Sequence, residues 1–218
     1  MPAVCSVYCL DMPLIRKEFI GPTAPTEADL QQVTAALRGG TAQERWDAAR
    51  SLGAQPAAAG MLGEALASEK DWRVREAIFT SLARLATVES AEAVVPYLRS
   101  DDAGMRTGAL DALRDMIPAV RPFLPALLGD PDPDIRLLCC DLVRELPAAD
   151  ATDLLCAVLA SDTEANVCAA AIEVLAEIGL PAALPALENC KARFPDQSFL
   201  TFAVKIAGER IASQRPAC

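Results

Sequence analysis

The chain has 218 residues, and because 52% of them are hydrophobic it can bury a large core. Aromatic residues make up only 5%, and much of the apolar content is Ala, Leu and Val, so helix packing is favoured over β-sheet and an all-α protein is predicted. Thirty acidic and twenty basic residues give a net charge of -10, the reverse of the balance that nucleic-acid binding normally needs, so no nucleic-acid partner is expected.

Residues 1–25 lie outside any repeat, and we expect them to form an N-terminal extension or a cap. Neither a basic stretch nor a small-residue cleavage site precedes Asp11, and no apolar run reaches the roughly 18 residues that a membrane helix needs. These features predict a cytoplasmic protein with no membrane partner. Met12 is an alternative start. Cys5 and Cys9 could hold a metal or form a disulfide, but no C-x-x-C pair, the usual zinc spacing, occurs in the chain.

One pattern recurs along the chain: an arginine, an apolar residue three positions later and another apolar residue four positions after that. Four copies with arginines 30 or 31 residues apart are Arg45-Ala48-Leu52, Arg75-Ile78-Leu82, Arg106-Ala109-Leu113 and Arg136-Cys139-Val143. A fifth copy, Cys168-Ala171-Leu175, lacks the arginine, and a sixth is expected at Phe199-Phe202-Ile206. This spacing places three residues on one helical face, so each copy predicts a helix that packs by that face.

A second set of apolar stripes lies between these helices. The expected helices are Glu27 to Arg38, Ala57 to Ser68, Ser90 to Arg99, Val120 to Leu128, Ala151 to Ala160 and Pro181 to Arg193. The segments that follow them are rich in Gly, Pro, Ser and Asp, which is typical of turns and helix N-caps. Two short helices cannot bury both their faces alone, so consecutive hairpins are predicted to stack.

These copies resemble the HEAT-repeat family, and most closely its short bacterial form associated with phycobilisome lyases. The resemblance implies a right-handed α-α superhelix of about five to six hairpins over residues 26–214, with residues 215–218 as a tail. It also implies a ladder in which loop Asp and helix Arg residues pair across neighbouring hairpins, with Arg75, Arg106 and Arg136 as its arginines. Cys168 interrupts this ladder, which is expected to loosen the fourth-to-fifth junction.

In such a stack the second helix of each hairpin lines the concave side, so its outward positions form a candidate binding surface for another protein. Six carboxylates of repeats three to five fall there and predict a docking strip for a basic segment: Asp111, Asp115, Asp141, Glu145, Glu173 and Glu177. Arg114 and Arg144 lie beside them, and an ordinary solvated helix face is the alternative. At the other end Trp46, with Arg50, is a further partner-contact candidate, as is Trp72.

The absence of histidine removes the ligands that HEAT-type di-iron enzymes need, and an acidic concave side does not suit a DNA glycosylase. No phosphate loop or nucleophile motif occurs. The sequence therefore predicts a non-catalytic, cofactor-free scaffold, adaptor or accessory protein that binds another protein in a bacterial cytoplasm. The alternatives are a bilin-lyase-like subunit, for which no aromatic pocket is evident, and a cofactor or metallocentre maturation factor using Cys5, Cys9 or the Cys139-Cys140 pair.

Overall fold

The computed structural model describes residues 27–213, so the predicted N-terminal extension, with Cys5 and Cys9, and the predicted tail lie outside the described residues. Within that range the chain forms six helical hairpins, each with a first and a second helix. The first helices, several of them with a short 3-10 turn, are α1 (Glu27–Gly39), η1 (Pro56–Ala58) with α3 (Ala59–Ser68), α5 (Val88–Val94) with η2 (Val95–Arg99), α7 (Ile117–Val120) with η3 (Arg121–Phe123) and α8 (Leu124–Leu128), α10 (Ala148–Ser161), and η4 (Pro181–Ala183) with α12 (Leu184–Arg193). The second helices are α2 (Ala42–Leu52), α4 (Trp72–Leu85), α6 (Ala103–Asp115), α9 (Pro133–Val143), α11 (Ala165–Ile178) and α13 (Ser198–Ser213).

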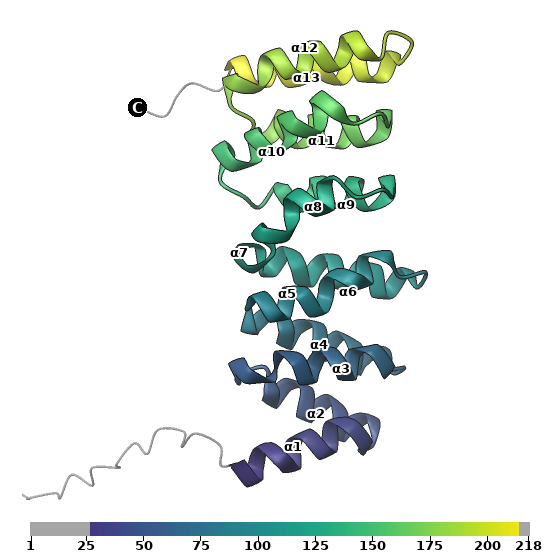
Figure 1. Cartoon of the computed structure of the whole chain (residues 1–218), viewed down its shortest axis with the longest axis vertical. Coiled ribbons are helices and arrows are strands. Elements are labelled where there is room, and N and C mark those ends of the chain that lie inside the picture. The colour runs from purple at the N-terminus through teal and green to yellow at the C-terminus, as the bar shows by residue number, and fades with distance from the viewer. Residues whose placement is uncertain (1–26, 214–218) are drawn as a thin grey trace, which may run out of the picture.

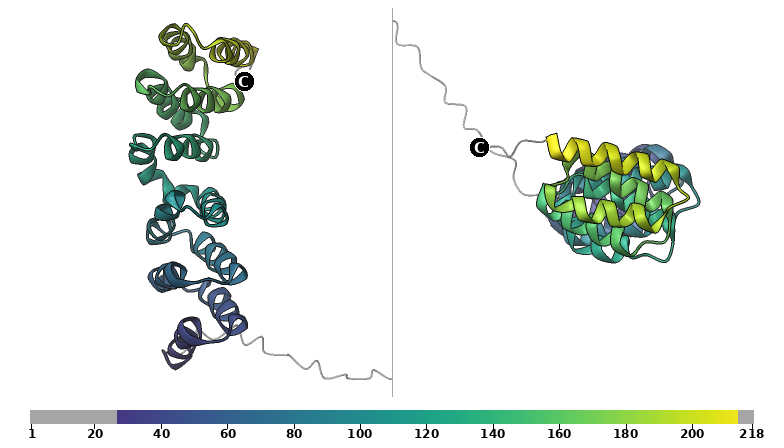
Figure 2. Two further views of the ribbon diagram at one scale, coloured as in Figure 1. Left: turned by 90° about the vertical axis from the view of Figure 1, so that its right-hand side faces the viewer. Right: turned by 90° about the horizontal axis from the view of Figure 1, so that it is seen from above.

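The hairpins stack in chain order from α1 to α13 and make an elongated solenoid (Figure 1). First helices form one layer and second helices the other, and the stack bends so that the second helices lie on its inner, concave side (Figure 2). The predicted all-α solenoid is therefore confirmed. None of the helices between residues 27 and 213 is long and apolar enough to cross a lipid bilayer.

Proline and capping residues explain where these helices begin and bend. Pro56, Pro96, Pro122 and Pro181 lie in the 3-10 turns of first helices, because proline lacks the N–H that a helix interior needs but suits a first turn. Thr41 and Glu44 form a reciprocal capping box at the start of α2. The side chains of Asp71, Asp102 and Asp132 accept backbone N–H groups at the starts of α4, α6 and α9, as the loop compositions predict.

The repeat positions form one continuous core. The apolar residues of the first five copies, from Ala48 and Leu52 to Ala171 and Leu175, are all buried. The sixth copy was predicted in the wrong register, since Phe199 is 43% and Phe202 66% exposed, whereas Leu200 and Val204 are buried. Leu200 is the third residue of α13, as Val167 is of α11, and the two lie 33 residues apart, so the repeat lengthens here and the predicted copy falls two residues too early.

The outer face of the last second helix differs from its counterparts. In inner hairpins this face packs on the next hairpin: Gly53 lies against Ser81, and Phe79 against Gly108. Counted from the start of the helix, the equivalent positions of α13 are Lys205 and Glu209, which are exposed and charged. This helix therefore ends the apolar stack with a solvated surface, as terminal repeats require.

Candidate partner-binding surface

Five carboxylates of the predicted docking strip lie on three consecutive second helices, α6, α9 and α11, and the sixth, Glu145, lies in the turn directly after α9. All are exposed except Asp141, which is half-buried. In α13 the position that Asp111, Asp141 and Glu173 hold in their helices is Ile206, and the exposed Phe202 lies one turn before it. The strip thus runs along the concave side and ends near an exposed aromatic ring.

Two arginines neutralise part of the strip and join its helices. Arg114 lies 2.8 Å from Asp111 in its own helix and 2.6 Å from Asp141 in α9. Arg144 contacts Asp141 at 3.4 Å and pairs with Glu177 in α11. Hydrogen bonding to Asp141 raises the pKa of Arg114, so its charge is fixed at any ordinary pH.

The remaining three strip residues are Asp115, Glu145 and Glu173. Each is exposed, and none forms an ion pair with another described residue. Because they come from three successive hairpins, they present uncompensated negative charge along the concave side. This distribution suits a partner that brings several cations at the spacing of the repeats.

A groove opens at the N-terminal end of the strip, between α4 and α6. We call it the Trp72 groove; its volume is about 460 Å³ and its lining includes Trp72, Phe79, Ala83, Met105, Gly108 and Ala112. Carboxylates of Glu76, Asp102, Asp111 and Asp115 surround it, with Arg75 as the one cation of its lining in the described structure. Trp72 is 69% exposed, which is unusual for so large an apolar side chain.

Two glycines create this groove. Gly104 and Gly108 are one turn apart in α6, where other second helices carry larger side chains such as Arg73 and Leu138. A Cβ on Gly108 would lie 2.8 Å from Phe79, so the glycine lets the ring pack against the α6 backbone. This groove was not predicted from the sequence. The pair of glycines inside a helix is the signal that could have revealed it.

At the N-terminal end of the stack, Arg50 lies over the ring of Trp46, with 4.7 Å between the guanidinium carbon and the ring centroid. Trp46 is half-buried and packs on the core, while Arg50 is exposed. A smaller hollow of about 280 Å³ adjoins this ring and is lined also by Arg73 and Glu76. Because the Arg50 guanidinium and the Trp46 ring already contact each other, this end of the stack leaves less aromatic and charged surface free for a partner than the Trp72 groove does.

The predicted ladder arginines differ in their partners. Arg136 makes two hydrogen bonds to Asp162, and Arg75 lies 3.0 Å from Asp102, so each contacts an acid of the next hairpin. Arg106 instead donates to the carbonyl of Ser100 in the loop before its own helix. At that junction Asp130 pairs with Arg99.

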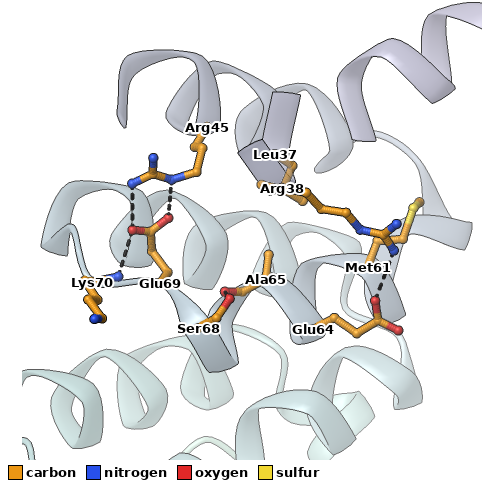
Figure 3. A pocket seen from close by; sticks show the side chains of 9 residues that line it. All are labelled: Leu37, Arg38, Arg45, Met61, Glu64, Ala65, Ser68, Glu69 and Lys70. Atoms are coloured by element: carbon orange, nitrogen blue, oxygen red, sulfur yellow. Dashed lines mark hydrogen bonds and ion pairs between the residues drawn. The ribbon is translucent and has the colours of Figure 1, made fainter. Parts of the chain in front are cut away.

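Arg45 belongs to the same ladder and had not been predicted. It binds Glu69 through two nitrogens at 2.7 and 3.0 Å beside a hollow of about 410 Å³ (Figure 3). The exposed pair Arg38 and Glu64 lies across the same hollow. Since its acids already bind its arginines, this hollow is a structural junction rather than an obvious ligand site.

Cys168 stands where the fifth copy lacks arginine, and a residue from the sixth hairpin compensates. The thiol of Cys168 lies 3.8 Å from the carbonyl of Asp162, and Arg193 of α12 donates to that carbonyl and to Leu159. The ladder runs toward the next hairpin, so the missing arginine concerns the fifth-to-sixth junction. The expectation of a looser fourth-to-fifth junction was therefore wrong, because Arg136 and Asp162 join it.

The cysteines of the described region are core residues rather than reactive groups. Burial raises the pKa of Cys139 and of Cys140 to about 12, so both remain protonated at neutral pH. Cys168 and Cys190 are also buried, and hydrogen bonding to Cys190 together with burial raises the pKa of Cys168. Within residues 27–213 no cluster of three or more acidic or cysteine side chains could hold a metal ion.

Comparison with known families agrees with the repeat geometry. A family model described as HEAT repeats matches residues 30–114 and 120–197, which is most of the chain. The chain belongs to the HEAT-repeat family. A sequence comparison with curated proteins finds no match.

One solved structure shows the same HEAT-type fold. The archaeal HEAT-like repeats protein from Thermococcus onnurineus NA1 is 17% identical, with a TM-score of 0.51, and the similarity covers 86% of this chain and 88% of that chain. The complex of CpcE and CpcF of phycocyanin lyase from Nostoc sp. PCC7120 gives 17% identity and a TM-score of 0.37 over 94% of this chain and 100% of that chain. At such low identity the first similarity shows the fold alone, and the second carries no argument about function.

Proposed function

We propose that this HEAT-repeat chain is a non-catalytic scaffold or adaptor that binds another protein through its concave side. The partner presents a basic segment to the strip formed by Asp111, Asp115, Asp141, Glu145, Glu173 and Glu177. One observation carries this proposal: Asp115, Glu145 and Glu173 are exposed without an ion-pair partner in the described chain, in three successive hairpins. Unneutralised charge repeated along one side costs self-repulsion, which a cationic partner would relieve.

The distribution of polar contacts supports binding rather than catalysis. The strip residues that have partners, such as Asp111 and Asp141, bind Arg114, so they hold adjacent helices together. The unpartnered carboxylates lie one in each of three hairpins, on an exposed surface where solvent and salt screen them. Such an arrangement favours association rate and partner selection over proton transfer.

A charge-reversal experiment tests the proposal. The chain with Asp115, Glu145 and Glu173 all changed to Lys is compared with the wild type in tagged co-purification from the native organism, followed by mass spectrometry and an absorption spectrum. The matched control changes Glu92, Asp153 and Asp196, which are exposed and lie outside the strip, to Lys. It has the same net charge as the strip variant.

A stoichiometric partner should remain with the wild type and the control but be lost from the strip variant. Raising the salt concentration should also release it, since exposed charge pairs are screened. Retention of the partner by the strip variant would contradict the proposal. A coloured wild-type preparation would favour a tetrapyrrole-handling role instead.

A further inference from the structure

The Trp72 groove combines an apolar floor with an acidic mouth. Phe79, Met105 and Ala112 are buried beneath it, while Trp72 extends at its rim and is 69% exposed. Trp72 belongs to the first turn of α4, so its ring is not needed to fill the core. Exposed aromatic surface beside a preformed apolar hollow is a common feature of protein-binding sites.

The charge around the groove is unbalanced. Arg75 lies in its wall, but it already contacts Asp102 at 3.0 Å and donates to the carbonyl of Glu69. Glu76 and Asp115 have no ion pair with any other described residue. The groove therefore attracts cations and repels a partner that carries acids next to its apolar residue.

The groove and the docking strip share two residues. Asp111 and Asp115 line the groove and are also the first carboxylates of the strip, which continues to Asp141 on α9 and to Glu145 directly after it. A chain segment leaving the groove toward α9 thus passes directly onto the strip. The two features form one continuous surface, which is apolar at the groove and acidic along the strip.

We infer that the Trp72 groove is the anchor site of this surface, and that its occupant is a bulky apolar side chain of a partner protein segment flanked by Lys or Arg. This inference rests on the proposed function and specifies the partner's chemistry. The apolar side chain would lie between Trp72 and Phe79, in the space that Gly104 leaves open. The flanking cations would lie against Glu76 on one side and against Asp111 and Asp115 on the other.

Three fluorescent peptides with a Gly and Ser background test the inference on the full chain by anisotropy. The first has one Leu with Lys residues on both sides, the second replaces that Leu by Ser, and the third replaces every Lys by Gln. We expect the first peptide to bind roughly 10- to 100-fold more tightly than the second, which is the usual effect of burying one large apolar side chain. The third peptide should bind much more weakly than the first.

Two variants locate the binding. Trp72→Ala removes the exposed rim, and Gly104→Leu fills the groove at a position where an added Cβ meets only the Asp102 carboxylate, at 3.2 Å. Each should reduce the affinity for the first peptide to that for the second. The matched control is Leu180→Ala, which truncates another exposed apolar side chain, after α11, and should leave all three affinities unchanged. Thermal melts followed by circular dichroism verify that each variant folds.

The outcomes separate this inference from the proposed function. Equal binding of the first two peptides would overturn the groove as an anchor site while leaving strip binding intact. Equal binding of the first and third would overturn the basic-partner proposal and the link between groove and strip. Failure of all three to bind would overturn both. Loss of the Leu-dependent affinity in Trp72→Ala and Gly104→Leu, but not in Leu180→Ala, would support the inference.

Discussion

Arg136 and Asp162 join the fourth and fifth hairpins through two parallel hydrogen bonds of 2.7 and 3.0 Å. The Asp162 side chain is only 4% exposed, and it also accepts the backbone N–H of Glu164 at 2.8 Å. Burial is the largest influence on the pKa of Asp162 and raises it. The hydrogen bonds from Arg136 and Glu164, with the charge of Arg136, outweigh burial and leave the pKa below its usual range.

Asp162→Ala should therefore lower the free energy of unfolding by about 3 kcal/mol, because removing one member of a buried pair leaves the other charge without compensation. Urea denaturation followed by circular dichroism measures the change. Glu64→Ala is the matched control, since it breaks the exposed pair with Arg38 and should cost less than about 1 kcal/mol. Equal losses in the two variants would show that the Asp162 junction adds no special stability.

Stability should also fall at acidic pH. The pKa of Glu69 is lowered chiefly by its hydrogen bond to Arg45, and the pKa of Asp162 is lowered as described above. A carboxyl group with a lowered native pKa stabilises the fold above its unfolded pKa, and that contribution is lost as pH falls through the native pKa. Urea midpoints should therefore decline below about pH 4, the usual range of free carboxyl groups.

The double variant Glu69→Gln with Asp162→Asn tests the origin of this decline. It should be less stable than the wild type at pH 7 but lose less stability between neutral and acidic pH. An unchanged pH slope would assign the acid sensitivity to other carboxylates. Circular dichroism at several pH values, with the same urea series, gives both slopes.

Ala86 ends α4 in a left-handed conformation, with φ of 48°. A residue with a Cβ is strained there by about 1 to 2 kcal/mol, whereas glycine is not. Ala86→Gly should raise the free energy of unfolding by roughly 0.5 to 1 kcal/mol after the extra unfolded-state entropy of glycine is included. Ala57→Gly, an exposed alanine at φ values below zero, should instead be neutral or destabilising in the same melts.

Arg114→Gln should change stability and binding in opposite directions. The variant loses the ion pairs with Asp111 and Asp141. Because these side chains are partly exposed, the free energy of unfolding should fall by no more than about 1 kcal/mol. The substitution leaves Asp111 without its ion pair and Asp141 with Arg144 alone, so the Lys-containing peptides should bind a few-fold more tightly. Arg121→Gln, which removes a pair with Asp150 in a first helix, provides the control for net charge. Unchanged affinity in Arg114→Gln would contradict binding at the strip.

The sequence predicts most of this fold because each repeat is local. Ala109 and Leu113 recur at a fixed period, and such spacing identifies a helix face without knowledge of its neighbours. The sixth copy was predicted two residues too early because the repeat lengthens before α13, and Phe199 and Phe202 form an apolar pattern that is exposed.

The candidate surface was only partly predictable, since its properties depend on contacts between helices. The periodicity places Asp111 and Asp141 on one side, but it does not show that Arg114 binds both of them. The Trp72 groove depends on the fit of Phe79 against Gly108, two residues of different helices. Arg193 compensates for Cys168 from another hairpin, which no pattern within one repeat reveals.

The polar outer face of α13 has a consequence for engineering this molecule. A further hairpin grafted after α13 would have to bury Lys205 and Glu209, whereas a duplicate of α10 and α11 inserted before the last hairpin would find apolar surfaces on both sides. The solenoid can therefore be lengthened internally. Each inserted module would move Phe202 one repeat farther from Trp72, which makes the chain a molecular ruler for the length of segment it accepts.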